Sequence, residues 1–132
     1  MTTFTLYKTA QCPRINVKQG ATLTYEIHHD NQHHLHIKLI ANSGGGFFSS
    51  DTIALKKVTA VLTSLPDTSH FSSTVFRCLF MGKSANNASF LAAVLRAEGL
   101  IAPSPSHTYR HIIGDIDALS HYVADIKRGE VK

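Results

Sequence analysis

The sequence predicts an α+β fold, with an antiparallel sheet in its N-terminal half followed by a helix-rich half. Residues 22–40 alternate between apolar and polar side chains, which is typical of half-buried strands. Apolar residues then recur at helical spacing over 55–65, where Pro66 ends the pattern. We therefore expect three to five strands, a central hairpin over about 22–40, and a helix over about 55–65 that backs the sheet.

Parity constrains the register of the hairpin. The apolar residues of both strands occupy odd positions: Leu23, Tyr25 and Ile27 on the first, and Leu35, Ile37 and Leu39 on the second. Cross-strand partners must then sum to an even number if both apolar sets face the core. A three-residue loop, 30–32, satisfies this condition, whereas a two-residue turn does not. We expect it to pair Ile27 with Leu35 and His28 with His34.

The outer face of this hairpin is a candidate metal site. It gathers three imidazoles, His28, His34 and His36, beside the carboxylate of Glu26. Neutral imidazole is a common ligand of zinc and other divalent ions. The spacing matches no closed metal-binding motif, however, and a solvated polar face fits the same residues. We expect neither a metal nor another cofactor.

The glycine-rich segments do not form a phosphate-binding loop. In a Walker loop the last glycine is followed by Lys and then Ser or Thr, but Gly44 to Gly46 precede Phe47 and Phe48. The later run over 82–84 lacks the earlier glycine. We interpret 44–46 as a turn or bulge that needs positive φ.

Length and composition limit the classes of protein. A chain of 132 residues with 43% hydrophobic content predicts one domain, 1–132, with 1–66 and 72–129 as substructures. Two cysteines and no secretion signal indicate the reducing cytoplasm, and no apolar run is long enough for a bilayer. A net charge of +4 favours anionic partners, above all nucleic acid.

The remaining segments of the chain are expected to form helices and short strands in an order that resembles a known arrangement. Short strands are expected near 4–6 and 15–17, and residues 52–55 fit either a strand or the start of the helix. Residues 72–80 favour a helix over a strand, 86–98 form the clearest helix, and Gly99 suits a left-handed cap. A strand over 108–113 and a helix from Asp115 to about 129 follow. Helix, glycine turn, helix, strand, loop and strand is the order of a winged helix-turn-helix.

In that arrangement 86–98 would be the recognition helix. Lys83, Arg96 and Arg110 would contact phosphates, and Ser84, Asn86 and Ser89 would approach base edges. Two alanines on the same face, Ala92 and Ala93, fit packing against another helix equally well. A second route to nucleic acid is the sheet itself, with Phe47, Phe48 and Lys38.

The sequence thus predicts a small basic cytosolic protein that binds nucleic acid, as a regulator or accessory factor. Its carboxylates are scattered and no Ser, His and Asp set can be assigned, so we expect no enzyme. The alternative is a protein-binding adaptor or inhibitor, for example one encoded by a mobile element or phage. A homodimer is compatible with either function.

Overall fold

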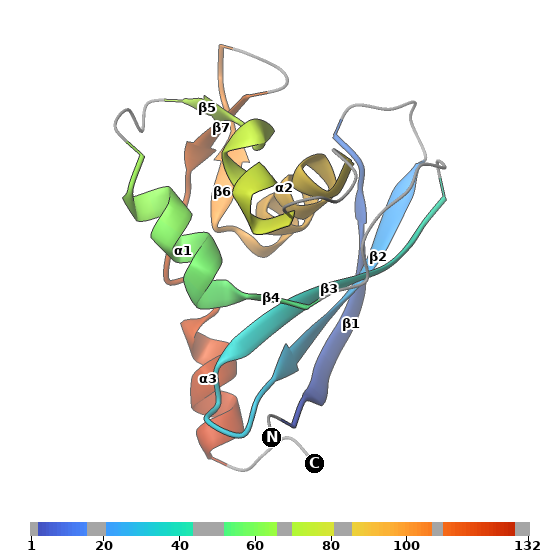
Figure 1. Cartoon of the computed structure of the whole chain (residues 1–132), viewed down its shortest axis with the longest axis vertical. Helices are drawn as coiled ribbons and strands as arrows, with labels where there is room; N and C mark the ends of the chain where they lie inside the picture. The colour runs from blue at the N-terminus through green and yellow to red at the C-terminus, as the bar shows by residue number, and fades with distance from the viewer. Residues whose placement is uncertain are drawn as a thin grey trace.

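The computed structural model describes residues 3–15, 21–43, 52–65, 70–80, 86–106 and 110–128. These residues form an α+β fold that begins with a four-stranded antiparallel sheet (Figure 1). Its strands are β1 (Thr5–Pro13), β2 (Thr22–His29), β3 (Leu35–Asn42) and β4 (Thr52–Ala54), paired in that order. Fold class and N-terminal sheet are as predicted. The strand expected near 15–17 is not seen at Ile15, which lies in a bend, and Val17 is outside the described residues.

The parity argument for the hairpin is confirmed, but the predicted partners are wrong. All six odd-numbered apolar residues of β2 and β3 are at most 4% exposed, so they face the core as expected. Ile27 pairs with Ile37 instead of Leu35, and His28 pairs with His36 instead of His34. The strands are therefore shifted by two residues relative to the prediction, which leaves the inward and outward faces unchanged.

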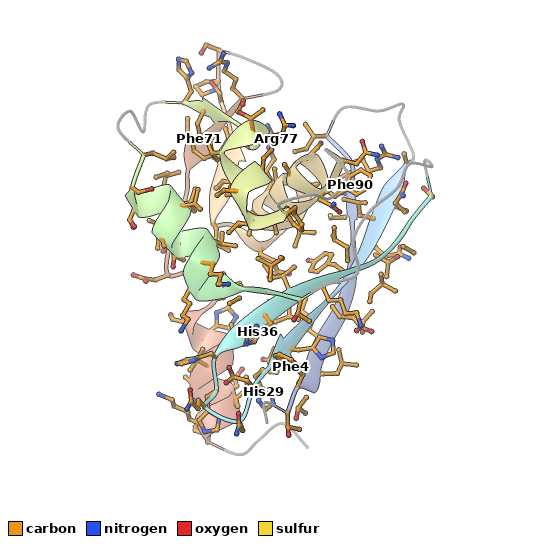
Figure 2. All side chains as sticks on the ribbon, viewed as in Figure 1. Phe4, His29, His36, Phe71, Arg77 and Phe90 are labelled. Carbon is orange, nitrogen blue, oxygen red and sulfur yellow. The ribbon has the colours of Figure 1, made fainter. Side chains whose placement is uncertain are left out.

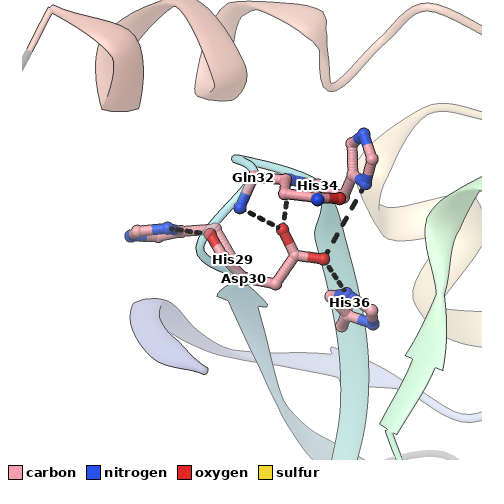
Figure 3. A network of polar contacts seen from close by, with 5 residues as sticks. All are labelled: His29, Asp30, Gln32, His34 and His36. Carbon is pink, nitrogen blue, oxygen red and sulfur yellow. Dashed lines mark hydrogen bonds and ion pairs between the residues drawn. The ribbon is translucent and has the colours of Figure 1, made fainter. Parts of the chain in front are cut away.

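Asp30 explains this shift. Its backbone N–H bonds to the carbonyl of His34 at 2.9 Å, which extends the ladder by one pair and moves the three-residue loop to 31–33. One oxygen, Oδ1, accepts from the backbone N–H groups of Gln32 and His34 at 2.8 and 3.0 Å (Figure 3). His33 ends the loop at φ 67°, the left-handed conformation that such loops require. Aspartate favours such a turn because its side chain can satisfy nearby N–H groups.

Helix α1 (Leu55–Thr63) follows β4 directly, which settles residues 52–54 as a strand. Its buried residues, Val58 and Leu62, are four apart, so they lie on one face that packs toward the core. The predicted helix is thus confirmed, and it contacts the sheet at β3 and β4. In Figure 1 it lies on the opposite side of α2 from strands β1 and β2.

The second half combines a smaller sheet with three helices. Strands β5 (Phe71–Ser72), β6 (Ile101–Pro103) and β7 (Arg110–Ile113) pair antiparallel in the order β5-β7-β6. Segment η1 (Ser73–Phe80) is a 3₁₀ helix, α2 spans Asn86–Glu98, and α3 spans Ser120–Lys127. The helix expected from Asp115 begins later, because 116–119 form turns closed by bonds such as Ala118 N–H to the Asp115 carbonyl.

Helix α2 ends as its sequence predicts. Gly99 has φ +90°, and its N–H bonds to the carbonyl of Arg96 at 3.2 Å. The N–H of Leu100 bonds to the carbonyl of Leu95 at 3.1 Å, and both leucine side chains are fully buried. These two bonds define a Schellman cap, which favours glycine at the left-handed position.

Helix α2 is also the centre of the core. Eight of its residues are buried, namely Asn87, Ala88 and the run Phe90–Leu95, so it has almost no exposed face. It packs between η1 on one side and strands β1 and β2 on the other (Figure 1). The winged helix-turn-helix arrangement is therefore not confirmed, since a recognition helix must present a face to the groove of DNA. The packing interpretation of Ala92 and Ala93 is the one that their burial supports.

Within the described ranges, no helix is both long enough and apolar enough to cross a membrane.

Candidate nucleic-acid interface

A groove of about 290 Å³ lies between the end of β1 and helix α2. The chain after β1 supplies Arg14 and Ile15, and α2 supplies Ala93, Arg96 and Ala97. Because the side chains of Ala93 and Ala97 are small, the groove stays open between Arg14 and Arg96. Two guanidinium groups from distant parts of the chain thus line one recess.

Arg14 is held in place by two contacts. Its Nη1 donates to Oδ1 of Asn42 at 2.9 Å, and its guanidinium carbon lies 4.7 Å from the centroid of the Phe90 ring. A guanidinium over an aromatic face is a favourable cation–π arrangement. Figure 2 shows Phe90 on the side of α2 that faces β1 and β2.

Arg96 is positioned by strand β7. Its Nε donates to Nδ1 of His111 at 2.9 Å, and its Nη2 donates to the carbonyl oxygen of Arg110 at 3.0 Å. The other ring nitrogen of His111 lies 2.8 Å from Oγ of Ser73. His111 is fully buried, and desolvation together with the neighbouring Arg96 charge lowers its pKa to about 4. Burial also lowers the pKa of Arg96.

Arginine and histidine side chains also lie beyond the groove, along β7. Arg110 is exposed, and its Nη1 lies 3.4 Å from Nδ1 of His70, the residue before β5. Arg77 on η1 is also exposed, and Figure 2 shows it at the same end as Phe71 of β5. We call Arg14, Arg96, Arg110 and His70 the arginine surface.

The described carboxylates lie away from the arginine surface. Asp115 and Asp117 follow the far end of β7, and Glu26, Asp30 and Asp125 belong to β2, its turn and α3. The side chain of Glu98, although close to Arg96 in sequence, is 3% exposed and turns inward. It accepts hydrogen bonds from the side chains of Lys8, Tyr25 and Tyr122. In the ion pairs between described residues, no carboxylate contacts the arginine surface, which favours an anionic ligand there.

The residues predicted to bind nucleic acid have different positions. Arg96 and Arg110 are brought together, although Arg96 is half-buried by its contact with His111, a role that the sequence did not reveal. Asn86 and Ser89 are half-buried on α2. Lys38 lies on β3 paired with Glu26, away from the arginine surface. The remaining predicted residues, Lys83, Ser84, Phe47 and Phe48, lie outside the described residues.

Arg14 and His70 complete the surface, His111 positions Arg96 from below it, and the sequence prediction missed all three. Arg14 follows Pro13 in a segment without periodicity, so no local pattern distinguished it from any other surface arginine. The histidines stood alone in the sequence, and only strand pairing places His111 opposite Phe71 and Arg110 opposite Ser72.

The histidines of the hairpin pair with carboxylates. His28 Nε2 lies 2.8 Å from Oε1 of Glu26, and His36 Nε2 lies 3.0 Å from Oδ2 of Asp30. Figure 3 shows Asp30 at the centre of this network, with His34 farther off at 3.8 Å. Among the described residues, no three His, Cys, Asp or Glu side chains are grouped so that they could hold a metal ion.

Comparison of the chain with protein-family models, with curated proteins and with solved structures finds no match.

Proposed function

We propose that this protein binds nucleic acid through the arginine surface, where guanidinium groups contact backbone phosphates. The observation that supports this proposal is the convergence of Arg14 and Arg96 on one groove, with exposed Arg110 adjoining Arg96. The planar guanidinium matches phosphate geometry and can donate two parallel hydrogen bonds. Side chains that are already held in place lose less conformational entropy when a ligand binds.

The burial of α2 determines the mode of binding in this proposal. A helix that is covered on nearly all sides cannot enter the major groove, so bases are not read by α2. The contacts made by arginines to phosphates fix position without specifying sequence. We therefore expect affinity that depends strongly on salt and weakly on nucleotide sequence. The net charge of +4 is compatible with this type of binding.

Fluorescence anisotropy with a labelled single strand and the matching duplex tests the proposal at low salt. Arg14→Glu and Arg110→Glu each reverse a charge at the arginine surface. Lys57→Glu reverses a charge at an exposed position of α1 and serves as the matched control. We expect each arginine variant to weaken binding at least about tenfold and the control to change it less than about twofold. If the wild-type protein fails to bind either strand form at micromolar concentration, the proposal is wrong.

One observation favours the alternative, a protein-binding adaptor. The large hydrophobic side chains of Phe4, Leu6 and Ile40 are 42%, 47% and 38% exposed on the first sheet or beside it. Phe4 packs edge-on against the ring of His36, at 4.7 Å between centroids, on the outward face (Figure 2). Leu6 lies in β1, an edge strand of that sheet, and edge strands can pair with another chain. If Leu6→Glu abolished self-association or partner binding while nucleic acid did not bind, this function would replace the first.

A further inference from the structure

A second recess lies at the other end of the molecule, between the turn of the β2–β3 hairpin and the starts of helices α1 and α3. Its volume is about 340 Å³, which is within the range of small-molecule sites. Its floor is aliphatic and is formed by Leu35, Leu55, Ile116, Leu119 and Val123. We call it the hairpin cavity. Figure 1 shows the start of α3 below the start of α1 and the hairpin turn farther down.

The polar groups that border the hairpin cavity are mostly cationic or able to donate hydrogen bonds. Lys56 of α1 and Lys127 of α3 are both exposed at its rim, and His33 and His34 line it from the hairpin. The carboxylate of Asp117 is the single acidic group among the described lining residues. Nδ1 of His33 is buried and has no hydrogen-bond partner in the described part of the chain. The balance of charge therefore favours an anion.

Both α1 and α3 begin at the cavity, and the start of α1 adds to this preference. Leu55 and Lys56 form the first turn of α1, and Leu119 and Ser120 are the N-cap and first residue of α3. In the described residues, neither N-cap makes a side-chain cap hydrogen bond and neither first turn contains an acidic residue. At α3 the N–H groups of Ser120 and Tyr122 already donate to the carbonyls of Asp117 and Leu119, both at 3.0 Å. The first-turn N–H groups of a helix lack partners within the helix, and the helix dipole makes that end attractive to negative charge, so the start of α1 is the one that favours an anion here.

We propose that the hairpin cavity binds a small organic anion with an apolar body. The anionic group would lie between the start of α1 and the lysines, while the apolar body covers the aliphatic floor. The cavity, the start of α1 and the cationic rim are separate observations that agree on this chemistry. Lysine ammonium and backbone N–H groups bind carboxylate oxygens through charge-assisted hydrogen bonds. The proposal does not depend on nucleic-acid binding, because the arginine surface lies at the opposite end, beside β7 and the end of β1 (Figure 1).

Isothermal titration calorimetry with octanoate tests this site on the full chain. Octanoate combines a carboxylate with an eight-carbon chain, whereas octanamide lacks the charge and acetate lacks the apolar body. We expect octanoate to bind at least about tenfold more tightly than either analogue. The double variant Lys56→Glu, Lys127→Glu should lose octanoate affinity by at least about tenfold.

Lys57→Glu is the matched control, since Lys57 is also exposed on α1 but does not line the cavity. It should change octanoate affinity by less than about twofold. Circular dichroism should show that all variants fold, as expected for exposed lysines. Absence of octanoate binding at millimolar concentration would overturn the proposal. Equal binding of octanoate and octanamide, or unchanged affinity in the double variant, would do the same.

Discussion

Arg96 donates from Nε to Nδ1 of His111 at 2.9 Å, and this contact fixes the protonation state of the imidazole. A guanidinium has no acceptor, so Nδ1 must be the acceptor and the ring proton must lie on Nε2. Nε2 then donates to Oγ of Ser73 at 2.8 Å. A second proton on the ring would remove the acceptor for Arg96 and place two cations in contact. The neutral imidazole therefore joins η1, α2 and β7.

We predict that His111 makes the protein less stable in mild acid. Its pKa is lowered from 6.5 to about 4 in the folded state, so the unfolded chain takes up a proton first as the pH falls. The contribution of neutral His111 to the free energy of unfolding is complete above pH 6.5. It falls by up to about 3 kcal/mol between about pH 6.5 and 4. Urea denaturation across this range should show the loss. His111→Gln should reduce the slope of stability against pH, whereas His121→Gln, at an exposed position, should leave it intact. Equal slopes for wild type and His111→Gln would contradict the prediction.

A second prediction concerns the turn at Asp30. Asp30→Ala removes the acceptor of two backbone N–H groups and should destabilise the protein by about 1–2 kcal/mol. Asp30→Asn keeps an oxygen at Oδ1 and should cost less. The pKa of Asp30 is lowered to about 2, chiefly through its hydrogen bonds with His36 and with the N–H groups of His34 and Gln32, against opposing desolvation. Its stabilisation should therefore be lost only below about pH 4. Thermal melts of both variants at neutral pH test the order, and an Asn variant as unstable as the Ala variant would contradict it.

Two glycines at the junction of α2 and β7 should differ in their tolerance of a side chain. Gly99→Ala forces a non-glycine residue to φ +90° and should cost about 1–2 kcal/mol, although its Cβ would meet only Ala118 Cβ at 3.7 Å. Gly114→Ala would place a Cβ 2.6 Å from the carbonyl oxygen of Gly99, so the backbone must move. We expect Gly114→Ala to be the more destabilising variant in chemical denaturation. If Gly99→Ala were the more destabilising variant, the backbone segments at Gly99 and Gly114 would be able to move apart with little loss in the free energy of unfolding.

The buried carboxylate of Glu98 should couple the first sheet to the helices. Nζ of Lys8 lies 2.9 Å from Oε2 of Glu98 and 2.8 Å from the hydroxyl oxygen of Tyr122. Glu98→Gln leaves the ammonium without its counter-charge and should cost about 2–3 kcal/mol. Lys8→Met leaves the carboxylate without the ammonium. The double variant should be more stable than the sum of the two single effects predicts, as measured in a double-mutant cycle of unfolding free energies. Strict additivity would mean that the pair is not coupled.

Local signals in the sequence were sufficient for much of the fold. Alternation placed Tyr25 and Ile37 in the core, and Gly99 marked the end of α2, because each depends on near neighbours in the chain. These local signals did not determine the hairpin register, because the parity argument permits shifts by two residues. The observed register depends on Asp30, which accepts hydrogen bonds from the N–H groups of Gln32 and His34.

The residues that meet at the candidate site could be nominated only in part for a similar reason. Arg96 and Arg110 could be nominated by charge, but Ala93 fits an exposed helix and a packed one equally well. Only the position of the first sheet shows that α2 is covered and that Arg14 lies beside Arg96. Such contacts between distant segments depend on tertiary packing, which residue periodicity does not encode.

The salt dependence of nucleic-acid affinity tests the proposed function most directly. Each phosphate that an arginine neutralises releases counterions, so the logarithm of the association constant should fall linearly with the logarithm of salt concentration. We predict a steep slope for the wild-type protein, a slope reduced by about one for Arg14→Ala or Arg110→Ala, and an unchanged slope for Lys57→Ala. Identical slopes for all four proteins would contradict phosphate contacts at the arginine surface.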